Sequence, residues 1–453
     1  MQALHRSSKR KLLTFTTACL VAATSIAATP AVAAITIASD PILYWNDIAI
    51  RFATAFSPGG APAQARAYAM VNIAMHDAVN ATRGNAHRSY LTGISTPGGD
   101  SRAAAAQAAH DVLVALNPAN SAQYATSLSA SLALIGDSSA KANGVATGQA
   151  YAAAILSRRA GDGSSVIAPY TSTNLPGDYR LTPGVGAAAL PAWGNVQPFV
   201  LSSANEVPVG PPPTLGSTAY AAAYNEVKEI GSLGSLTRTA DQTNSALFWD
   251  VSNGGTWIRA GLVVAEDEGL DTLGFAGAFA TLAVGIADAS IAVFKAKYDY
   301  RLWRPITAIQ LGDIDGNDAT VADPTWTSLF ASPGHPSYVS GHASISGVAS
   351  TILQSYFGDT EAFSFGIGPD SRSFSSLSQA AQDAADSRLW GGIHFRFDND
   401  AGLALGRQVG THVLRRGIFA SVPEPSSWAM MIFGFALAGW KLRSRPVARA
   451  AHF

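Results

Sequence analysis

One apolar run limits what this chain can fold into. TLGFAGAFATLAVGIADASIAVF, residues 272–294, contains a single charged side chain, Asp288. The run is long enough to cross a bilayer, which takes about 20 residues. However, it holds three glycines and an internal carboxylate, and the body of the chain has no comparable partner segment. A helix that is apolar all round is also what the centre of a large bundle requires. We therefore predict a buried central helix.

The N-terminal residues, 1–33, are predicted to be a signal peptide. A basic start and an apolar run lead to Ala31-Val32-Ala33, with cleavage expected near Ala34. The only cysteine, Cys19, lies in this segment. The mature body is therefore expected to contain no thiol and no disulfide.

The C-terminal segment, 422–453, begins with Pro423-Glu424-Pro425 and continues into an apolar stretch and a basic tail. This arrangement resembles the PEP-CTERM sorting signal of Gram-negative bacteria that make exopolysaccharide. The resemblance implies that the tail is held in the inner membrane and then removed by an exosortase. The body would then reach the cell surface, the exopolysaccharide matrix or the medium. A plain C-terminal membrane anchor is the alternative.

The predicted folded domain between these ends, residues 34–421, is acidic. The whole chain has 30 Lys and Arg against 31 Asp and Glu, but the two end segments hold four basic residues each and one acidic residue, Glu424. The domain therefore has a net charge of about −8, which argues against nucleic acid or an anionic membrane surface as a partner. Membrane contact is expected only through the C-terminal segment before processing.

Hydrophobic periodicity predicts mostly helix. Apolar residues at three-and-four spacing indicate helices over 41–56 and 62–82, separated by the breaker SPGGAP. Asp100 can cap a helix over 101–116, Asn120 can open the next, and another is expected from Asp137 to about Arg159. Residues 161–215 are predicted to be a long irregular connection, with helices resuming near Ser217. The best strand candidate is AFSFGIG, 362–368. The fold class predicted is all-α, a large helical bundle or two fused bundles.

The first motif closes the apolar helix. Lys297 and Arg304 are seven residues apart, which places them about 20° from the same helix face, and Pro305 is expected to end the helix. Two cations at the end of an apolar helix need an anion or solvent, because an unpaired buried charge is costly. A solvated face with ion pairs is the alternative.

The second motif lies in HPSYVSGHAS, residues 335–344, just before a helical run. Backbone N–H groups at a helix start have no partner within the helix and favour an anion. Gly341 lets an oxygen approach the backbone, Ser340 adds a hydroxyl, and His342 can give or take a proton near neutral pH. Ser340 could instead serve only as an N-cap.

The third motif is ADSRLWGGIHFRFDNDAG, residues 385–402. Arg388 offers a planar set of donors suited to an oxoanion, and His394 and Asp398 follow. Asp398 could hold one imidazole N–H, which leaves the other nitrogen as a ligand or nucleophile. A structural ion pair is the alternative. Together the three motifs supply three cations, neutral donors and one basic atom, as a bound tetrahedral oxoanion requires.

These motifs resemble a known signature. Three motifs are complete and in order within 297–398. The first is Lys followed after six residues by Arg-Pro, the second is Ser-Gly-His, and the third is Ser-Arg followed after five residues by His. They are similar to the motifs of the superfamily of vanadium-dependent haloperoxidases and type 2 phosphatidic acid phosphatases. The stretch WND…AMHDAVNA and the segment GIHFRFD also resemble secreted bacterial haloperoxidase-like proteins. The resemblance implies the haloperoxidase type of helical bundle, vanadate as cofactor, and hydrogen peroxide and a halide as substrates.

Carried over by position, the resemblance also implies roles for single residues. His394 would bind vanadium or attack phosphorus, His342 would act as acid and base, and Asp398 would support His394. The oxygens of vanadate or phosphate would be held by Lys297, Arg304, Ser340, Gly341 and Arg388.

The halide pocket is expected at His335 and Phe294. His335 stands where algal bromoperoxidases have His and chloroperoxidases have Phe, which favours bromide or iodide. Phe294 departs from the Trp of chloroperoxidases and leaves the choice of halide open.

Two other functions stay open. The same pocket could serve a secreted acid phosphatase that cleaves a phosphate ester through a phosphohistidine, although small phosphatases of this superfamily need far fewer residues. A non-catalytic, exopolysaccharide-associated surface protein is the other, and the complete motifs argue against it.

Two lesser features complete the sequence. Asp313, Asp315, Asn317 and Asp318 could bind calcium, but the glycine is misplaced for an EF-hand, and a solvated turn is favoured. His76 and Asp77 are interpreted as structural, and no partner pattern is recognised for His87, His110 and His412.

Overall fold

The computed structural model describes residues 35–52, 60–251, 253–266, 268–360, 362–367 and 370–421. The predicted signal peptide, with Cys19, and the segment 422–453 lie outside the described residues. The boundaries proposed for these two segments remain predictions.

The described chain is mostly helical, so the predicted all-α fold is confirmed. Its α-helices are α1 (Pro41–Arg51), α2 (Gly60–Thr82), α3 (Ser101–Leu116), α4 (Ser121–Ala133), α5 (Ser139–Arg159), α6 (Thr218–Ile230), α7 (Ala240–Phe248), α8 (Asn253–Ala265), α9 (Thr272–Tyr300), α10 (Pro305–Gln310), α11 (Gly341–Phe357), α12 (Leu377–Trp390) and α13 (Arg396–Arg416). The strand candidate is also confirmed, as β1 (Phe363–Ile367), which pairs antiparallel with β2 (Asp370–Phe374).

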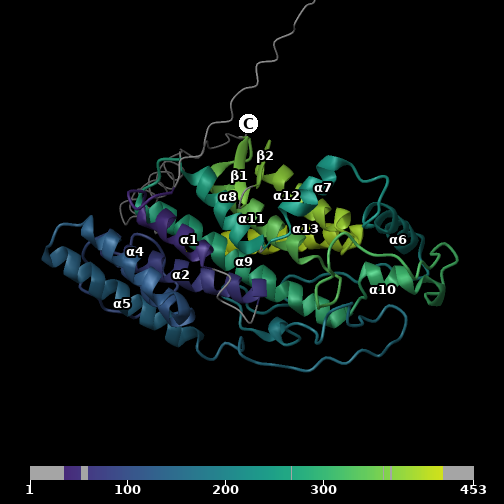
Figure 1. Cartoon of the computed structure of the whole chain (residues 1–453). Coiled ribbons are helices and arrows are strands. Elements are labelled where there is room, and N and C mark those ends of the chain that lie inside the picture. The colour runs from purple at the N-terminus through teal and green to yellow at the C-terminus, as the bar shows by residue number, and fades with distance from the viewer. Residues whose placement is uncertain are drawn as a thin grey trace, which may run out of the picture. The chain divides into compact units, whose positions relative to one another are not determined.

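The helices pack in two groups on either side of α9 (Figure 1). Helices α2 to α5 pack on one another, and α2 also packs on α9. Helices α11, α12 and α13 form the second group, in which α11 and α13 both contact α9. The prediction allowed either one large bundle or two fused bundles, and in the described chain the two groups share the central helix α9.

Glycines bring α11 and α13 close together. A Cβ atom on Gly406 would lie 2.0 Å from the carbonyl oxygen of Ser344, and one on Gly347 would lie 2.6 Å from that of Leu403. Neither position can carry a side chain without moving the helices apart. The close packing holds α11 against α13, and the first turns of both helices carry predicted site residues.

Helix α9 is the predicted buried central helix. By length and composition alone it could cross a membrane, yet its apolar window is entirely buried inside the fold. Asp288, in the middle of it, is fully buried and accepts hydrogen bonds from the backbone N–H groups of Phe199, Val200 and Leu201 at 2.6–2.8 Å. This one carboxylate therefore ties the long connection between α5 and α6 to the core.

Several local predictions are refined by the structure. The Asp100 side chain does cap α3, whereas the Asn120 side chain makes no capping bond to α4. Helix α5 begins after Ser138, which caps it, and Asp137 instead pairs with Lys141.

The prediction that Pro305 ends a helix is wrong. Helix α9 ends at Tyr300, where Arg301 adopts a left-handed conformation with φ of 54°, and Pro305 begins α10. A proline fits a first helical position because its missing N–H would have no partner there. Lys297 and Arg304 therefore belong to different helices, and the predicted 20° relation between them does not apply.

The acidic turn at 312–320 is closed by its own hydrogen bonds. Asp315 accepts from the backbone of Asn317 and from the Thr320 hydroxyl, and Asp313 accepts from Ala322 N. Among the described residues, no group of three or more His, Cys, Asp or Glu side chains is arranged to hold a metal ion. The oxygens of Asp313 and Asp315 are thus used by hydrogen bonds within the turn itself.

Replacing Asp288 should weaken the fold. In Asp288→Ala, three buried backbone N–H groups lose their acceptor, and each such loss costs about 1–3 kcal/mol. We expect the free energy of unfolding to fall by roughly 3 kcal/mol or more, measured by urea denaturation. The control Asp137→Ala removes an exposed carboxylate and should leave the unfolding midpoint unchanged. Equal midpoints for the two variants would contradict the anchoring role of Asp288.

Candidate active site

The three sequence motifs meet around one cavity of about 360 Å³. Among the predicted residues, its wall includes Phe294, Lys297, His335, Gly341, His342, Arg388 and His394. Arg304, Ser340 and Asp398 are fully buried directly behind this wall. The structure therefore brings together every predicted site residue, from α9, the start of α10, the segment before α11, the end of α12 and the start of α13.

His394 is held in one orientation by Asp398. Asp398 Oδ2 lies 2.9 Å from His394 Nδ1 and also accepts from the Ser337 hydroxyl and from Phe395 N. Burial raises the pKa of Asp398 to about 6. Because a carboxylate accepts only, Nδ1 carries the hydrogen and His394 Nε2 keeps its lone pair. Burial, and then Arg304 and the other nearby cations, hold the pKa of His394 well below its usual value, so the ring is neutral.

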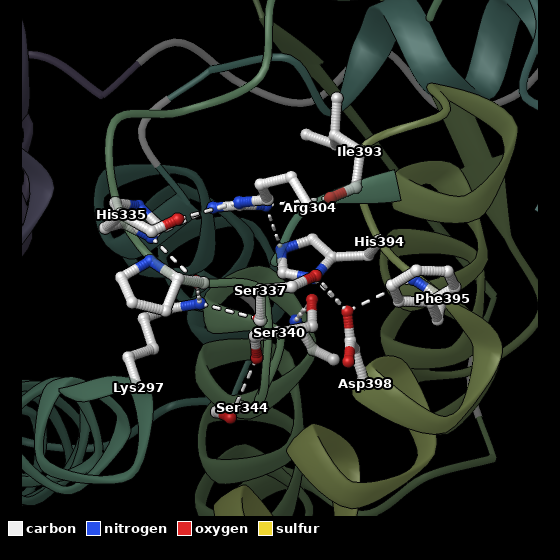
Figure 2. Close-up of polar contacts among 12 residues, drawn as sticks. Lys297, Arg304, His335, Ser337, Ser340, Ser344, Ile393, His394, Phe395 and Asp398 are labelled. Carbon is white, nitrogen blue, oxygen red and sulfur yellow. Dashed lines mark hydrogen bonds and ion pairs between the residues drawn. The ribbon is translucent and has the colours of Figure 1, made fainter. Parts of the chain in front are cut away.

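Arg304 joins two segments of the site (Figure 2). It donates to the carbonyl and to Nδ1 of His335 at 2.8 and 2.9 Å, and to the carbonyl of Ile393 at 2.8 Å. It also donates to His394 Nε2 at 3.1 Å. Burial lowers the pKa of Arg304 to about 10, and the side chain remains a cation at neutral pH. The lone pair of His394 thus lies beside a fixed positive charge.

Lys297 is fully buried and donates to the carbonyl oxygens of Pro336 and Ser337 at 2.8 and 2.9 Å. An ammonium group has three hydrogens, so one donor remains for a ligand. Burial and the neighbouring Arg304 hold the pKa of Lys297 well below its usual value. A bound anion would favour the protonated form and reverse this effect.

Arg388 is held by the segment between α7 and α8. It donates to the carbonyl of Trp249 and to Asp250, both at 3.2 Å. Its Nε atom is buried and has no partner in the described part of the chain. A buried donor without an acceptor is unusual in a native protein, and this one belongs to a residue of the cavity wall.

The start of α11 supplies neutral groups. The Ser340 hydroxyl accepts from Ala343 N at 3.4 Å, so Ser340 is the N-cap, and its own hydrogen is still available for donation. His342 Nε2 lies 3.1 Å from the carbonyls of Trp249 and Val251, which assigns the hydrogen to Nε2 and the lone pair to Nδ1. Burial, and then Arg388, lower the pKa of His342 well below its usual value.

Gly341 borders open space. A Cβ added there would find no atom closer than Val293 Cγ1, at 3.9 Å. Packing therefore does not require glycine at this position, and a side chain would only occupy part of the cavity wall that the Gly341 backbone now forms.

The charge balance of the site indicates its ligand. Lys297, Arg304 and Arg388 are buried, whereas the carboxylates that contact the cluster are Asp398, which holds His394, and the half-exposed Asp250. Buried positive charge without a full complement of anions is costly. With the free donors of Lys297 and Arg388 and the lone pair of His394, the site fits a tetrahedral oxoanion such as vanadate or phosphate.

The two residues predicted for the halide pocket lie together. The rings of His335 and Phe294 are 5.2 Å apart, and both border the cavity. Burial, and then Lys297 and Arg304, hold the pKa of His335 well below its usual value, so this ring is also neutral.

Sequence reasoning missed the groups that position the motif residues. Ser337 binds Asp398, and the carbonyls of Trp249 and Val251 orient His342. Backbone carbonyls leave no signature in a sequence, and a serine between Pro336 and Tyr338 has none either.

The other histidines of the described residues lie outside the cavity wall. His76 is buried and pairs with Asp77, which agrees with the structural interpretation. The other three do have partners, which the sequence analysis did not recognise: His87 contacts His76, His110 pairs with Asp111, and His412 pairs with Glu206. For His110 the adjacent aspartate was the available signal.

Comparisons with known proteins agree with this fold and these motifs. Residues 277–418 match the family model of the VCPO second helical-bundle domain, and residues 421–445 match the PEP-CTERM protein-sorting motif. A curated relative, the vanadium chloroperoxidase of Curvularia inaequalis, is 26% identical over 181 residues, which are 32% of this chain and 29% of that protein. The chain thus spans less than a third of the length of this relative.

Two solved structures are similar over most of the chain. A bacterial vanadium-dependent iodoperoxidase superposes with a TM-score of 0.73 and 25% identity, over 84% of this chain and 97% of that one. A holo-type bacterial vanadium-dependent chloroperoxidase superposes with a TM-score of 0.66 and 16% identity, over 81% and 96%. At 16% identity, the similarity to the chloroperoxidase supports the fold only.

Fold and motifs together define a helical protein of the haloperoxidase type. Its fold matches vanadium haloperoxidase structures, and its residues 277–418 and 421–445 are similar to the VCPO second helical-bundle domain and to the PEP-CTERM sorting motif.

Gly341 allows ligand binding to be tested apart from folding. In Gly341→Ala the new methyl group meets no neighbour closer than 3.9 Å, so thermal stability should be unchanged or slightly higher, as alanine favours helix. Orthovanadate binding, measured by calorimetry, should weaken about tenfold or more if one hydrogen bond to the oxoanion is lost. The matched control Gly136→Ala, also in open space, should change neither property. If Gly341→Ala binds vanadate as tightly as the wild-type protein, the backbone of Gly341 does not contact the oxoanion.

Proposed function

We propose that this protein is an exported, vanadate-dependent haloperoxidase that oxidises bromide or iodide with hydrogen peroxide to hypohalous acid. The observation that carries the proposal is the lone pair of His394 Nε2, which Asp398 orients and which accepts from Arg304, with Lys297 and Arg388 as the other buried cations that act on the ring. A neutral, oriented imidazole is what a metal centre needs as a ligand.

Each predicted residue has a role in this proposal. His394 Nε2 would be the ligand to vanadium. The oxygens of the cofactor would be held by Lys297, Arg304, Ser340, Gly341 and Arg388. Bound vanadate would supply a Lewis acid that activates peroxide without changing its own oxidation state. The protein supplies the positive charge that keeps this anion in place.

His342 would take the proton that peroxide loses on entering the site. The imidazole is neutral and its Nδ1 is the unprotonated nitrogen. Once Nδ1 is protonated, the carbonyls of Trp249 and Val251, which already accept from Nε2, stabilise the charged ring. The same ring can return the proton when water leaves.

His335 and Phe294 would form the halide side of the cavity. A neutral imidazole and an aromatic edge suit a large, polarisable anion better than a strongly hydrated one. The likeness to a structure described as an iodoperoxidase supports the same choice of bromide or iodide.

A phosphatase remains the second candidate because His394 Nε2 could equally attack phosphorus. The cations would then hold the phosphate group of an ester, and His342 would protonate the leaving oxygen. The same geometry supports both reactions, so the two must be separated by assay.

The PEP-CTERM motif suggests export and sorting to the surface of a Gram-negative cell. We propose that an exosortase-type enzyme removes the segment after Ser421, and that the mature protein acts at the surface, in the exopolysaccharide matrix or in the medium.

The primary test uses residues 34–421 stripped of oxoanions. With peroxide and bromide or iodide, halide oxidation should require added orthovanadate, and p-nitrophenyl phosphate should not be hydrolysed. His394→Ala should reduce halide oxidation by at least ~10²-fold, because it removes the ligand while the helical fold remains. Circular dichroism checks the fold.

Two outcomes would decide against the proposal. Phosphate release that orthovanadate inhibits would make the protein a phosphatase with His394 as nucleophile. Full halide oxidation by a folded His394→Ala variant would mean that the cavity is not the active site.

Asp398 is expected to affect ligand binding through its hydrogen bond to His394. In Asp398→Asn the amide cannot fix the Nδ1–H tautomer as a carboxylate does, so orthovanadate affinity should fall about 10- to 100-fold. The affinity is measured by calorimetry, and the control Asp400→Asn alters a carboxylate two residues further along the same helix, outside the cavity wall. Equal affinity in the two variants would rule out a positioning role for Asp398.

A further inference from the structure

The cavity is larger than an inorganic reaction needs. Its volume of about 360 Å³ falls within the range of sites for small organic ligands, about 300–1,000 Å³. A tetrahedral oxoanion has five heavy atoms and a halide has one. Most of the space is therefore left over when the proposed cofactor and halide are in place.

The extra space runs along one face of α9. Ile286, Ser290, Val293 and Lys297 all border the cavity and follow one another at intervals of four, three and four residues. This spacing keeps them on one side of a helix, and eleven residues rise about 16 Å. The cavity thus extends about three helical turns from the cationic end at Lys297.

The wall away from Lys297 is mostly apolar, and its polar side chains are Ser290 and Asn253. Ala65 and Pro62 of α2, Ile345 of α11 and Leu190 complete it beside Ile286 and Val293. The charged lining residues, Lys297 and Arg388, belong to the oxoanion cluster. An uncharged, hydrophobic molecule would be desolvated favourably in this part of the cavity.

Besides the amide of Asn253, one hydroxyl lies in this wall. Ser290 is 7% exposed, borders the cavity, and has no hydrogen-bond partner within the described residues. Its oxygen is not among the fully enclosed unpaired atoms of the described chain, so it is open to the cavity and can bond a ligand. Ser290 lies seven residues, about 10 Å of helix, from Lys297, so a ligand bonded to it would direct its other end at the cations.

We propose that this apolar arm binds an uncharged phenol of one or two rings, whose hydroxyl bonds Ser290 and whose ring is halogenated before hypohalous acid escapes. The inference rests on the proposed haloperoxidase function. In the step, the hypohalous acid transfers its halogen to a ring carbon, that carbon loses its proton, and the released hydroxide and proton form water. Hydrogen peroxide is the oxidant overall, and the halide is the source of the halogen.

The experiment compares 2-naphthol with 2-naphthol-6-sulfonate, whose charge excludes it from an apolar arm. The vanadate-loaded protein receives both acceptors with iodide and peroxide, and the ratio of the two iodinated products is measured. Hypoiodous acid generated without protein gives the reference ratio. This ratio does not depend on how much active protein is present.

We expect the wild-type protein to favour 2-naphthol about tenfold or more over the reference ratio, as a binding preference of about 1.4 kcal/mol would give. Ser290→Phe, which fills the arm, should return the ratio to the reference value. Thr281→Ala, which removes another α9 hydroxyl that bonds Gly277 and Tyr356 away from the cavity, should keep the wild-type preference. A wild-type ratio equal to the reference would overturn the proposal.

Direct binding keeps the inference separate from the proposed function. Equilibrium dialysis of 2-naphthol, without halide or peroxide, should show saturable binding that Ser290→Phe abolishes and Ser290→Ala weakens. Binding without any vanadate-dependent iodide oxidation would refute the haloperoxidase while keeping an apolar ligand site. Iodide oxidation without saturable 2-naphthol binding would refute the arm alone. If Ser290→Phe does not fold, Ser290→Leu replaces it under the same criteria.

Discussion

Buried positive charge is the constraint on which this structure depends. Lys297, Arg304 and Arg388 are placed in the interior with too few carboxylates to balance them. Such a cluster is tolerated only if the surrounding backbone offers carbonyl oxygens and a ligand supplies the missing negative charge. The carbonyls of Pro336, Ser337, His335, Ile393 and Trp249 provide the first part. The segments that contain these carbonyls are therefore held together partly because each of them contributes carbonyl oxygens that solvate the three cations.

The central helix gives that cluster its position. Helix α9 contacts both helix groups, and Lys297 lies in its last turn. Asp288 fastens the connection between α5 and α6 to the middle of the same helix. These two charged side chains on α9 thus have separate roles: Asp288 anchors a connection, and Lys297 lines the cavity. The apolar residues between them form the core. A helix with no polar residue could have filled the core equally well, but it could not have anchored the connection between α5 and α6 or supplied a cation to the cavity.

The sequence predicted the fold class and the candidate site for different reasons. The buried helix, the helical pattern and β1 follow from periodicity, which is local. The site followed from three short motifs whose side chains carry the chemistry. What it could not predict was how these residues are held. Pro305 begins a helix instead of ending one because the chain reverses at Arg301, and no pattern marked that turn. Ser337 and the carbonyl of Val251 act through distances that exist only in the folded chain.

The helical period of α9 explains how one cavity can have two chemical characters. A single face of the helix carries Lys297 at its end and Val293, Ser290 and Ile286 on the preceding turns. A charged reagent is stabilised only near Lys297, and an uncharged acceptor is stabilised only further along, because each region is solvated by its own wall. Two molecules of opposite polarity can therefore occupy the cavity together without competing. Under the proposed function, the order of the residues along the helix would determine which end of the organic molecule faces the oxidant.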